Sequence, residues 1–328
     1  MAHRKLSQQQ RTRIAKIQAQ RSHTPITDAN QDAPCLPGRV ITRHGQNLLI
    51  RSEQDEEIHC LLRQNLGEVV CGDHVLWQPS ADNGVVVALQ TRSSTLSRPD
   101  YSGRDKPIAA NISQLIVVLA PEPAPTGYLL DQYLIAAERM GVAALVCLNK
   151  MDLLDPTQRQ AFQQNLTHYA DLGYPLIQVS AKTPNGWHAL HHHLANHTSI
   201  LLGQSGVGKS SLTNSLLATT TLAEGCLSRT TGLGKHTTST ATLYTLPTGG
   251  ELIDSPGVRS FRLGGLTRQV LQQGYPEIQA LQGQCRFHNC GHQQEPGCAV
   301  LLAVQQGTIH PERLANFQHM LTQLKESP

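Results

Sequence analysis

A glycine-rich segment in the second half of the chain has the residue types and spacing of a phosphate-binding loop. It consists of Gly203, Gln204, Ser205, Gly206, Val207, Gly208, Lys209, Ser210 and Ser211. The segment follows an apolar run at 199–202 and precedes a helix-like stretch at 211–217, the strand–loop–helix order that a Walker A motif requires. Backbone amides would surround a β-phosphate, Lys209 would neutralise β- and γ-phosphate oxygens, and the Ser210 hydroxyl would bind magnesium. The segment therefore predicts a site for a nucleoside triphosphate with magnesium.

Two further motifs predict that the bound base is guanine. One consists of Asn149, Lys150, Met151 and Asp152 and the other of Ser180, Ala181 and Lys182, and each directly follows an apolar strand-like run. The carboxylate of Asp152 would accept hydrogen bonds from N1–H and the exocyclic amine of guanine, a donor pair that adenine does not offer. Asn149 would brace the loop and approach N7, the stem of Lys150 would cover the base, and the second motif would form the opposite wall. Each motif alone also occurs in surface turns, so their joint position beside a phosphate loop is what favours GTP.

Two segments are expected to sense the γ-phosphate. The residues Asp254, Ser255, Pro256 and Gly257 fit the DxxG pattern, which ends a strand and contacts magnesium through water. The polar, glycine-rich stretch 229–238 resembles a switch segment, in which a threonine caps the magnesium ion. Thr237 and Thr238 are both candidates for that role, and the sequence does not decide between them.

The residue after the DxxG pattern is Val258, where Ras-like enzymes carry a glutamine that orients the attacking water. Because valine cannot hydrogen-bond, another group must position that water. His236 lies beside Thr237 in the switch segment, and its imidazole could orient or polarise the water. The alternative is a solvated switch histidine with no catalytic part. We take His236 as the candidate catalytic residue.

The order of these motifs differs from that of ordinary GTPases, in which the phosphate loop comes first. Here the two guanine motifs precede it. All the motifs are expected on loops at the carboxyl edge of one sheet, so the site survives if the old termini are joined and new ones are opened elsewhere. The sequence thus predicts a circularly permuted GTPase. In this order the second switch runs directly into the C-terminal region, so the nucleotide state could move that region as a lever.

Cysteine and histidine residues gather near the C-terminus in a pattern suited to a metal ion. Cys285, Cys290, His292 and Cys298 supply three thiolates and an imidazole, a closed donor set typical of structural zinc. His288 is an alternative imidazole, and a reactive or merely buried group of cysteines is the other interpretation. The run of histidines at 191–193 is interpreted as solvated surface, because consecutive helical residues point in different directions.

The elements that must position these residues fall into three regions. Short strand-like runs separated by turn signals are predicted at 38–42, 47–51, 57–63, 73–77 and 84–89. They suit a small closed barrel, for which the OB-fold is the expectation, although another small barrel would give the same pattern. Residues 92–111 lack a clear period and are predicted to be a linker. Strands then alternate with helices, including one at about 156–172, which predicts a mostly parallel α/β sheet. Beyond residue 266 the chain is helical in tendency.

The 328-residue chain begins with a strongly basic stretch, although the net charge of the whole is only +3. Its first 27 residues contain no aspartate or glutamate and hold Arg4, Lys5, Arg11, Arg13, Lys16 and Arg21. This composition fits an arm that binds polyanions, or else a solvated, disordered terminus. The start lacks the apolar core of a secretory signal, and no apolar run is long enough to span a bilayer. We expect a soluble, cytoplasmic protein without a membrane partner.

Taken together, the motifs resemble the RsgA (YjeQ) family, circularly permuted GTPases of bacterial small-ribosomal-subunit maturation. The resemblance covers nearly the whole chain and also includes Leu96, Ser97, Arg98, Pro99 and Asp100. It implies an N-terminal OB-fold at 36–97, a permuted α/β P-loop GTPase domain at 98–266 and a helical zinc-binding domain at 267–328. The basic stretch before them is predicted to be a flexible arm at 1–35. It also assigns the fourth zinc ligand to His292 and points to His236 for catalysis.

The resemblance further implies the partners and cofactors of the chain. These are the small (30S) ribosomal subunit with its 16S rRNA, GTP or GDP, magnesium with GTP, and one structural zinc per chain. GTP hydrolysis would be stimulated by the subunit, and we expect a monomer. Two other functions are weighed against this one: a P-loop kinase for a small molecule, which has no use for the two guanine motifs, and a GTP-regulated RNA-binding scaffold without turnover.

Overall fold

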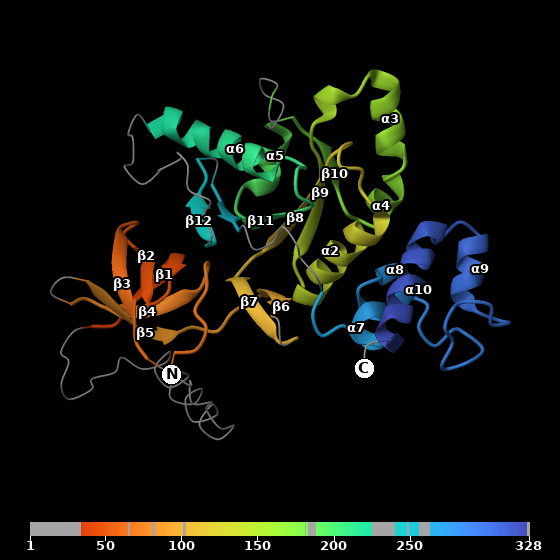
Figure 1. The fold of residues 1–328 in the computed structure, drawn as a ribbon, viewed down its shortest axis with the longest axis horizontal. Helices are drawn as coiled ribbons and strands as arrows, with labels where there is room; N and C mark the ends of the chain where they lie inside the picture. The colour runs from red at the N-terminus through yellow and green to blue at the C-terminus, as the bar shows by residue number, and fades with distance from the viewer. Residues whose placement is uncertain are drawn as a thin grey trace.

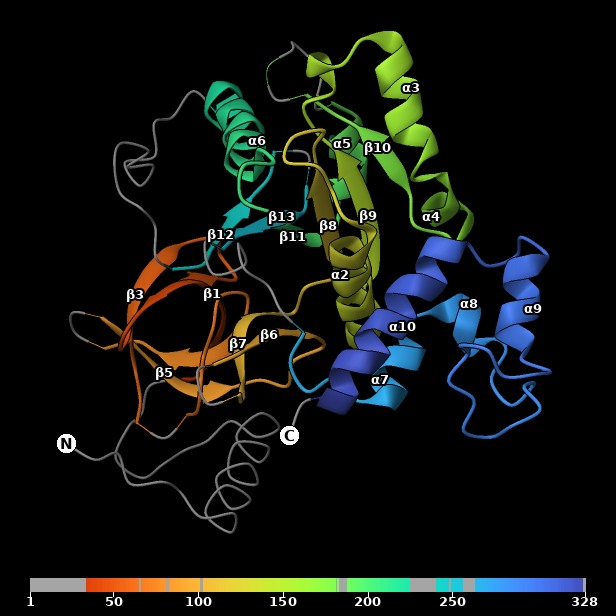
Figure 2. The ribbon, with the colours of Figure 1, turned by 45° about the vertical axis from the view of Figure 1, so that its right-hand side comes forward.

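The computed structural model describes residues 34–64, 66–80, 83–100, 103–180, 182, 188–224, 240–247, 249–255 and 263–326. These residues form a β-barrel, a central α/β unit and a helical C-terminal unit. The barrel and the helical unit lie on opposite sides of the α/β unit (Figures 1 and 2). None of the described helices is long and apolar enough to cross a membrane.

The barrel is a closed five-stranded OB-fold, as predicted. Its strands are β1 (Leu36–His44), β2 (Asn47–Ser52), β3 (Glu57–Leu62), β4 (His74–Gln78) and β5 (Gly84–Leu89). They pair in the order β1-β2-β3-β5-β4, and β4 returns to β1 to close the barrel. Alternating apolar residues such as Val40, Leu48 and Val86 point inward and are fully or almost fully buried, because successive side chains of a strand face opposite sides.

A β-hairpin occupies the region that was predicted to be a linker. It consists of β6 (Thr95–Pro99) and β7 (Asp105–Ala110), which pair antiparallel. The prediction that residues 92–111 form a linker was therefore wrong. The alternating pattern of each strand covers only a few residues and contains a proline, a residue that is rare inside sheets, so the pattern did not reveal the strands. Burial decides the conformation, since Leu96 and Ala109 join the core of the α/β unit.

The α/β unit is built on a six-stranded part of a longer sheet. Its strands are β8 (Gln114–Leu119), β9 (Ala143–Leu148), β10 (Leu176–Gln178), β11 (Thr198–Leu202), β12 (Thr242–Thr245) and β13 (Glu251–Asp254). The order is β10-β9-β8-β11-β13-β12, and all neighbours pair in parallel except β12 with β13. The predicted, mostly parallel sheet is thus confirmed.

Helices cover both faces of this sheet. They are α2 (Gly127–Met140), α3 (Pro156–Gln164), α4 (Thr167–Asp171), α5 (His188–Leu194), α6 (Lys209–Glu224) and the 3-10 turn η1 (Met151–Leu153). Leu115 and Val117 of β8 pack in one apolar cluster with α2, whereas Ile116 and Val118 pack in another with α5 and α6. The single helix predicted at about 156–172 is two helices, because α3 ends at Gln164 and is followed by its C-cap Asn165, a residue with low helix propensity.

The C-terminal unit is helical, as predicted, and shares its core with the α/β unit. It contains α7 (Arg268–Gln273), α8 (Pro276–Gln279), α9 (Ala299–Gln305) and α10 (Pro311–Glu326). Ile135 of α2 belongs to the same apolar cluster as Tyr275 and Phe317. The two units therefore pack through a continuous hydrophobic interface.

A fully buried carboxylate lies within this interface. Asp131 of α2 accepts hydrogen bonds from the hydroxyls of Tyr169 and Tyr275 at 2.9 and 3.0 Å and from Nδ2 of Asn316 at 2.8 Å. It also forms an ion pair with the fully buried Arg313, which pairs with Glu277 as well. Buried charges need such partners, so the network fixes the position of α10 on α2.

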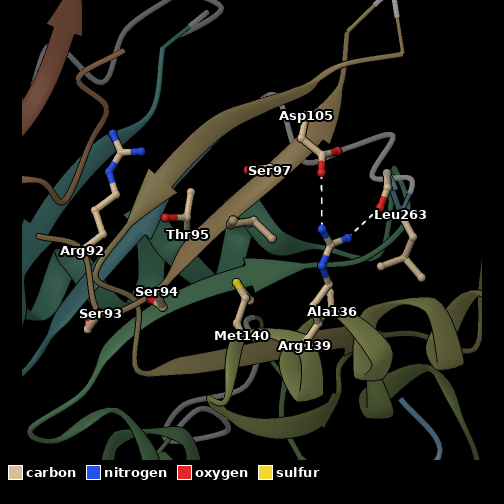
Figure 3. Close-up of a pocket in the computed structure, with 12 residues that line it drawn as sticks. Arg92, Ser93, Ser94, Thr95, Ser97, Asp105, Ala136, Arg139, Met140 and Leu263 are labelled. Carbon is tan, nitrogen blue, oxygen red and sulfur yellow. Dashed lines mark hydrogen bonds and ion pairs between the residues drawn. The ribbon is translucent and has the colours of Figure 1, made fainter. Parts of the chain in front are cut away.

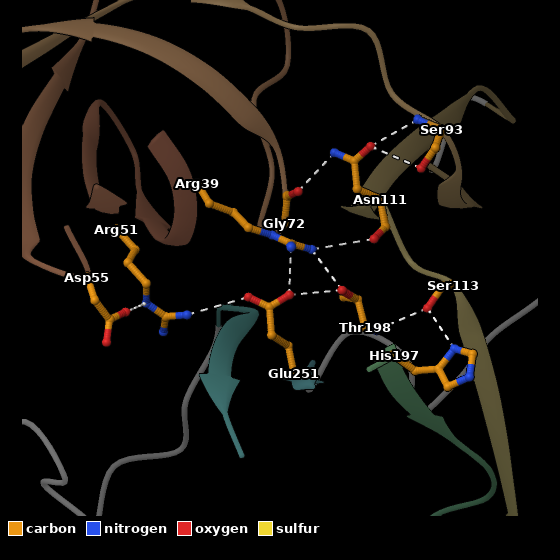
Figure 4. A network of polar contacts seen from close by, with 10 residues as sticks. All are labelled: Arg39, Arg51, Asp55, Gly72, Ser93, Asn111, Ser113, His197, Thr198 and Glu251. Carbon is orange, nitrogen blue, oxygen red and sulfur yellow. Dashed lines mark hydrogen bonds and ion pairs between the residues drawn. The ribbon is translucent and has the colours of Figure 1, made fainter. Parts of the chain in front are cut away.

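Polar contacts connect the barrel to the central sheet (Figure 4). Arg39 of β1 pairs with Glu251 of β13 at 2.6 Å and donates to the Thr198 hydroxyl at 3.0 Å. Arg51 of β2 pairs with the same carboxylate at 3.4 Å. Since β11 and β13 carry the phosphate loop and the DxxG motif, the barrel is attached to the two strands that lead into the nucleotide motifs.

Candidate active site and metal centre

The predicted nucleotide motifs meet at one edge of the central sheet. The strands β9, β10, β11 and β13 precede the NKxD motif, the SAK motif, the phosphate loop and the DxxG motif, respectively. Because these strands are all parallel, their carboxyl ends lie at the same edge. The permuted chain order therefore leaves the spatial arrangement of the motifs intact.

The phosphate loop connects β11 to α6 in the predicted order. Gly203, Gly206 and Gly208 have φ values of 141°, 87° and 97°, a region that side chains strongly disfavour. Lys209, the first residue of α6, donates from Nζ to the carbonyls of Gly203 and Gln204 at 2.6 and 2.7 Å. The ammonium thus lies over the loop, while Ser205, Ser210 and Ser211 are exposed. This geometry suits a loop that wraps around phosphate oxygens.

The NKxD motif is in direct contact with the phosphate loop. Asn149 is 1% exposed, and its Nδ2 donates to the carbonyl of Val207 at 2.8 Å. A side chain on Gly208 would collide with the same amide nitrogen. The side chain of Asn149 therefore braces the phosphate loop against the base-binding loop.

The candidate base-binding residues form a second group of contacts. Asp152, in η1, is exposed and accepts a hydrogen bond from the hydroxyl of buried Ser180 at 2.7 Å. The same hydroxyl accepts from the backbone N–H of Lys182 at 3.2 Å. Lys150 adopts a left-handed conformation with φ 60°, and its Nζ donates to the carbonyl of Glu122 at 3.0 Å. One Asp152 oxygen is held by Ser180, so the orientation of the carboxylate is fixed.

Sequence analysis missed the loop that follows β8, to which Glu122 belongs. Besides the contact with Lys150, Pro123 lies 3.6 Å from the position that a Cβ on Gly206 would take. The loop therefore touches both the base-binding loop and the phosphate loop. Only its place after a strand of the same sheet would have revealed it, because its residues carry no recognisable motif.

Several predicted residues lie outside the described part of the chain. Asp254 ends β13 and Ser255 is buried. The candidates outside the described residues are Ala181, His236, Thr237, Thr238 and Gly257.

Leu263 and Gly264, where the described chain resumes after β13, lie beside the hairpin and α2. A cavity of about 280 Å³ lies there, lined by residues that include Arg92, Thr95 and Asp105 (Figure 3). Arg139 of α2 donates to the carbonyl of Gly264 at 2.6 Å and pairs with Asp105 of β7 at 3.4 Å. A side chain on Gly264 would collide with the Asp105 carboxylate. This contact positions the start of the C-terminal unit.

The predicted metal ligands also come together. One ligand atom each from Cys285, Cys290, His292 and Cys298 lies within 4.8 Å of the others. Nδ1 of His292 lies 3.3 Å from Sγ of Cys298 and 3.7 Å from Sγ of Cys285. His288 is exposed and is not part of this group. Three thiols and an imidazole that converge in this way could hold a metal ion.

These features define a class of protein. A phosphate loop, an NKxD motif and a DxxG motif converge on a parallel sheet in permuted order, next to an OB-fold barrel and a Cys3His cluster. The chain is a circularly permuted GTPase, an enzyme that hydrolyses GTP. Its residues 89–264 match the family model described as RsgA GTPase, and the chain belongs to the RsgA family.

Relatives along the whole chain agree with this assignment. A protein of Alcanivorax borkumensis named small ribosomal subunit biogenesis GTPase RsgA is 46% identical, over 99% of this chain and 97% of the relative. The crystal structure of YjeQ from Thermotoga maritima is 30% identical and superposes with a TM-score of 0.74, over 90% of this chain and all of that one. YloQ, described as a circularly permuted GTPase, shares the fold with a TM-score of 0.72 at 24% identity, over 93% of this chain and 99% of that one.

Proposed function

We propose that the chain binds the small (30S) ribosomal subunit and hydrolyses GTP during late maturation of its 16S rRNA, with hydrolysis stimulated by the subunit. The meeting of the guanine motifs with the phosphate loop at one sheet edge supports GTP as the substrate. The name of the Alcanivorax relative supports the ribosomal role. Ribosomal subunits mature in the cytoplasm of bacteria, where we infer that the chain acts as a monomer.

Guanine recognition is assigned to the loops after β9 and β10. Asp152 would accept from N1–H and the exocyclic amine, and Ser180, which donates to that carboxylate, would hold it in the acceptor orientation. Asn149 would approach N7, the stem of Lys150 would cover the base, and Ala181 with Lys182 would complete the wall. Adenine presents an acceptor at N1, so at that position it would offer the Asp152 carboxylate no hydrogen-bond donor.

Phosphate and magnesium binding is assigned to the remaining motifs. Lys209 would turn from its own loop carbonyls to the β- and γ-phosphate oxygens, and the amides of the glycine-rich loop would surround the β-phosphate. Ser210, one of Thr237 and Thr238, and Asp254 through water would hold magnesium. When bound, the ion neutralises charge that develops on the phosphoryl oxygens. Gly257 would contact the γ-phosphate with its backbone.

Catalysis is assigned to His236, which would orient the attacking water. A test compares GTP turnover of the chain and of His236→Ala, with and without purified small subunits. The exposed His192, on α5, supplies a matched control, His192→Ala. We expect unchanged GTP affinity and an approximately 10²- to 10⁴-fold loss of stimulated turnover for His236→Ala alone. Full stimulation of this variant would remove His236 from the mechanism, and absence of stimulation in the unmodified chain would refute the ribosomal role.

The Cys3His cluster is assigned to one structural zinc ion. The donor set fits zinc, which favours thiolate and imidazole ligands in a closed tetrahedral site. Cys290, His292 and Cys298 are 4–7% exposed, so no open position for substrate is expected. Cys290 and Cys298 belong to the apolar core of the C-terminal unit, and the ion would stabilise that core by fixing the loop that precedes α9.

RNA binding is assigned to the barrel, the basic arm at 1–35 and the zinc-binding domain at 267–328. The proposed boundary between the barrel domain (36–97) and the GTPase domain (98–266) falls within β6, so the hairpin belongs to the junction. Deletion of the arm should weaken subunit binding and reduce its salt dependence, because fewer phosphate counterions are released. Equally tight and equally salt-dependent binding would show that the arm takes no part.

A further inference from the structure

A second group of metal-ligating side chains lies between the α/β unit and the C-terminal unit. It consists of His168 on α4, His310 directly before α10 and Glu312 in the first turn of α10. We call these three residues the interdomain cluster. One ligand atom of each residue lies within 4.8 Å of those of the other two. The cluster borders a cavity of about 510 Å³ that is lined also by Thr126 and Asn165. It is separate from both the nucleotide motifs and the Cys3His cluster.

His168 carries a nitrogen atom that nothing else explains. Its Nε2 is buried and has no hydrogen-bond partner among the described residues. A buried polar atom without a partner is costly and calls for a ligand or a water. Burial, together with His310 and Arg313 nearby, lowers the pKa of His168 to about 4. The unpartnered Nε2 is the atom that a bound ion would satisfy.

The other two members are placed to complete a coordination set. The rings of His168 and His310 are stacked, with centroids 3.9 Å apart and planes inclined by 8°. Nδ1 of His310 accepts a long hydrogen bond of 3.4 Å from the backbone N–H of Glu312, so this nitrogen carries the lone pair that an ion would take in place of that weak contact. Glu312 lies against Gly127 at the start of α2. Parallel rings do not aim at one point, so the rings must turn toward the adjacent cavity on binding.

Glu312 supplies the negative charge that the interdomain cluster offers to a cation. Arg313, which lies close enough to His168 to lower its pKa, is paired with Asp131 and Glu277. These two carboxylates reduce the repulsion that Arg313 exerts on a cation in the cluster. In a tetrahedral zinc site the ligand atoms are about 3.4 Å apart, so the three ligand atoms, which lie within 4.8 Å of one another, must approach as the rings turn.

We propose that His168, His310 and Glu312 form a second metal site, for zinc or a similar divalent transition ion, that joins the GTPase unit to the C-terminal unit. Two imidazoles and one carboxylate suit such ions better than magnesium or calcium. Three protein ligands leave a fourth position, which a water molecule from the cavity fills. Because the ligands come from α4 and from the start of α10, the bound ion fixes the C-terminal unit on the GTPase unit.

The site is tested on the full-length chain with one zinc already bound, by titration with cobalt(II) followed by absorption spectroscopy and calorimetry. We expect a second equivalent to bind with a d–d spectrum that lacks the thiolate-to-cobalt charge-transfer band of a cysteine site. His168→Gln, His310→Gln and Glu312→Gln should each weaken this second event at least about tenfold, the loss seen when even an outer partner of a metal ligand is removed. Added cobalt should raise the melting temperature of the unmodified chain and not of these variants.

The control variant is His192→Gln, which removes an exposed histidine of α5 far from the interdomain cluster in sequence. Its cobalt binding should equal that of the unmodified chain, and all variants should retain one zinc and GTP affinity. The proposal is refuted if the unmodified chain binds a single metal ion. It is also refuted if the second event shows the thiolate band, or if it survives in all three cluster variants.

Discussion

Removal of the buried carboxylate at Asp131 is expected to release the C-terminal unit from the GTPase unit. In Asp131→Ala the hydroxyls of Tyr169 and Tyr275 and the amide of Asn316 lose their common acceptor. Arg313 keeps Glu277 but loses its other partner while remaining buried. The change is therefore not a simple loss of one hydrogen bond, because it leaves a partly compensated charge in the interface.

The expected magnitude follows from these contacts. Breaking a buried ion pair by removing one partner costs about 3–5 kcal/mol. Each buried hydroxyl without a partner adds about 1–3 kcal/mol, whereas Glu277 and water entering the new space reduce the total. We expect a net loss of about 4 kcal/mol from the docked state, which is roughly a thousandfold change in the docking equilibrium.

Hydrogen–deuterium exchange of α10, with limited proteolysis after residue 263, measures this effect directly. Asp131→Ala should strongly increase exchange in α10, and Asp131→Asn should give an intermediate result because it keeps an acceptor and loses the charge. Asp171→Ala, which removes an exposed carboxylate of α4, is the control and should change neither readout. If Asp131→Ala exchanges like the control, the network does not hold the two units together.

Three other changes test the nucleotide and metal assignments. Asp152→Asn should cost about 2–4 kcal/mol of GTP affinity and shift preference toward xanthosine triphosphate, as nucleotide titration would show; unchanged GTP affinity would contradict the guanine assignment. Gly208→Ala should lower affinity for GTP and GDP alike, since the new methyl group collides with Asn149. Affinities equal to those of the unmodified chain would show that Asn149 can move aside. Cys290→Ser or Cys298→Ser should lose the structural zinc by elemental analysis and unfold the C-terminal unit; a protease-resistant, zinc-free variant would refute its structural role.

The nucleotide motifs could be predicted because local sequence determines them. A glycine with positive φ, such as Gly208, and a lysine at the start of α6 reveal a phosphate loop without knowledge of any distant residue. The Cys3His cluster could be predicted for the same reason, because its four residues lie within one short segment. The strands of the barrel were predicted closely because each has a clear alternation between turn signals.

The interface between units could not be predicted, since its contacts depend on residues far apart in the chain. Asp131 meets Tyr169 and Asn316, which are 38 and 185 positions away. Glu251 meets Arg51 across 200 positions. Nothing in the local pattern of Asp131 marks it as buried, because a helix position occupied by a carboxylate is usually exposed. The β6–β7 hairpin was missed for a related reason, as its burial against the α/β core outweighs its weak strand pattern.

The contact of Arg139 with Gly264 and Asp105 changes how a signal would leave the nucleotide site. The chain is anchored at Asp254 by β13 and again at Gly264 by this contact. With the C-terminal unit fixed on α2 by Asp131, a swing of that whole unit would have to break a buried network. A pull exerted by the γ-phosphate would instead reach Gly264 first and pass through Asp105 to the hairpin. The mechanical path then leads toward the barrel, and the C-terminal unit serves as the stationary frame.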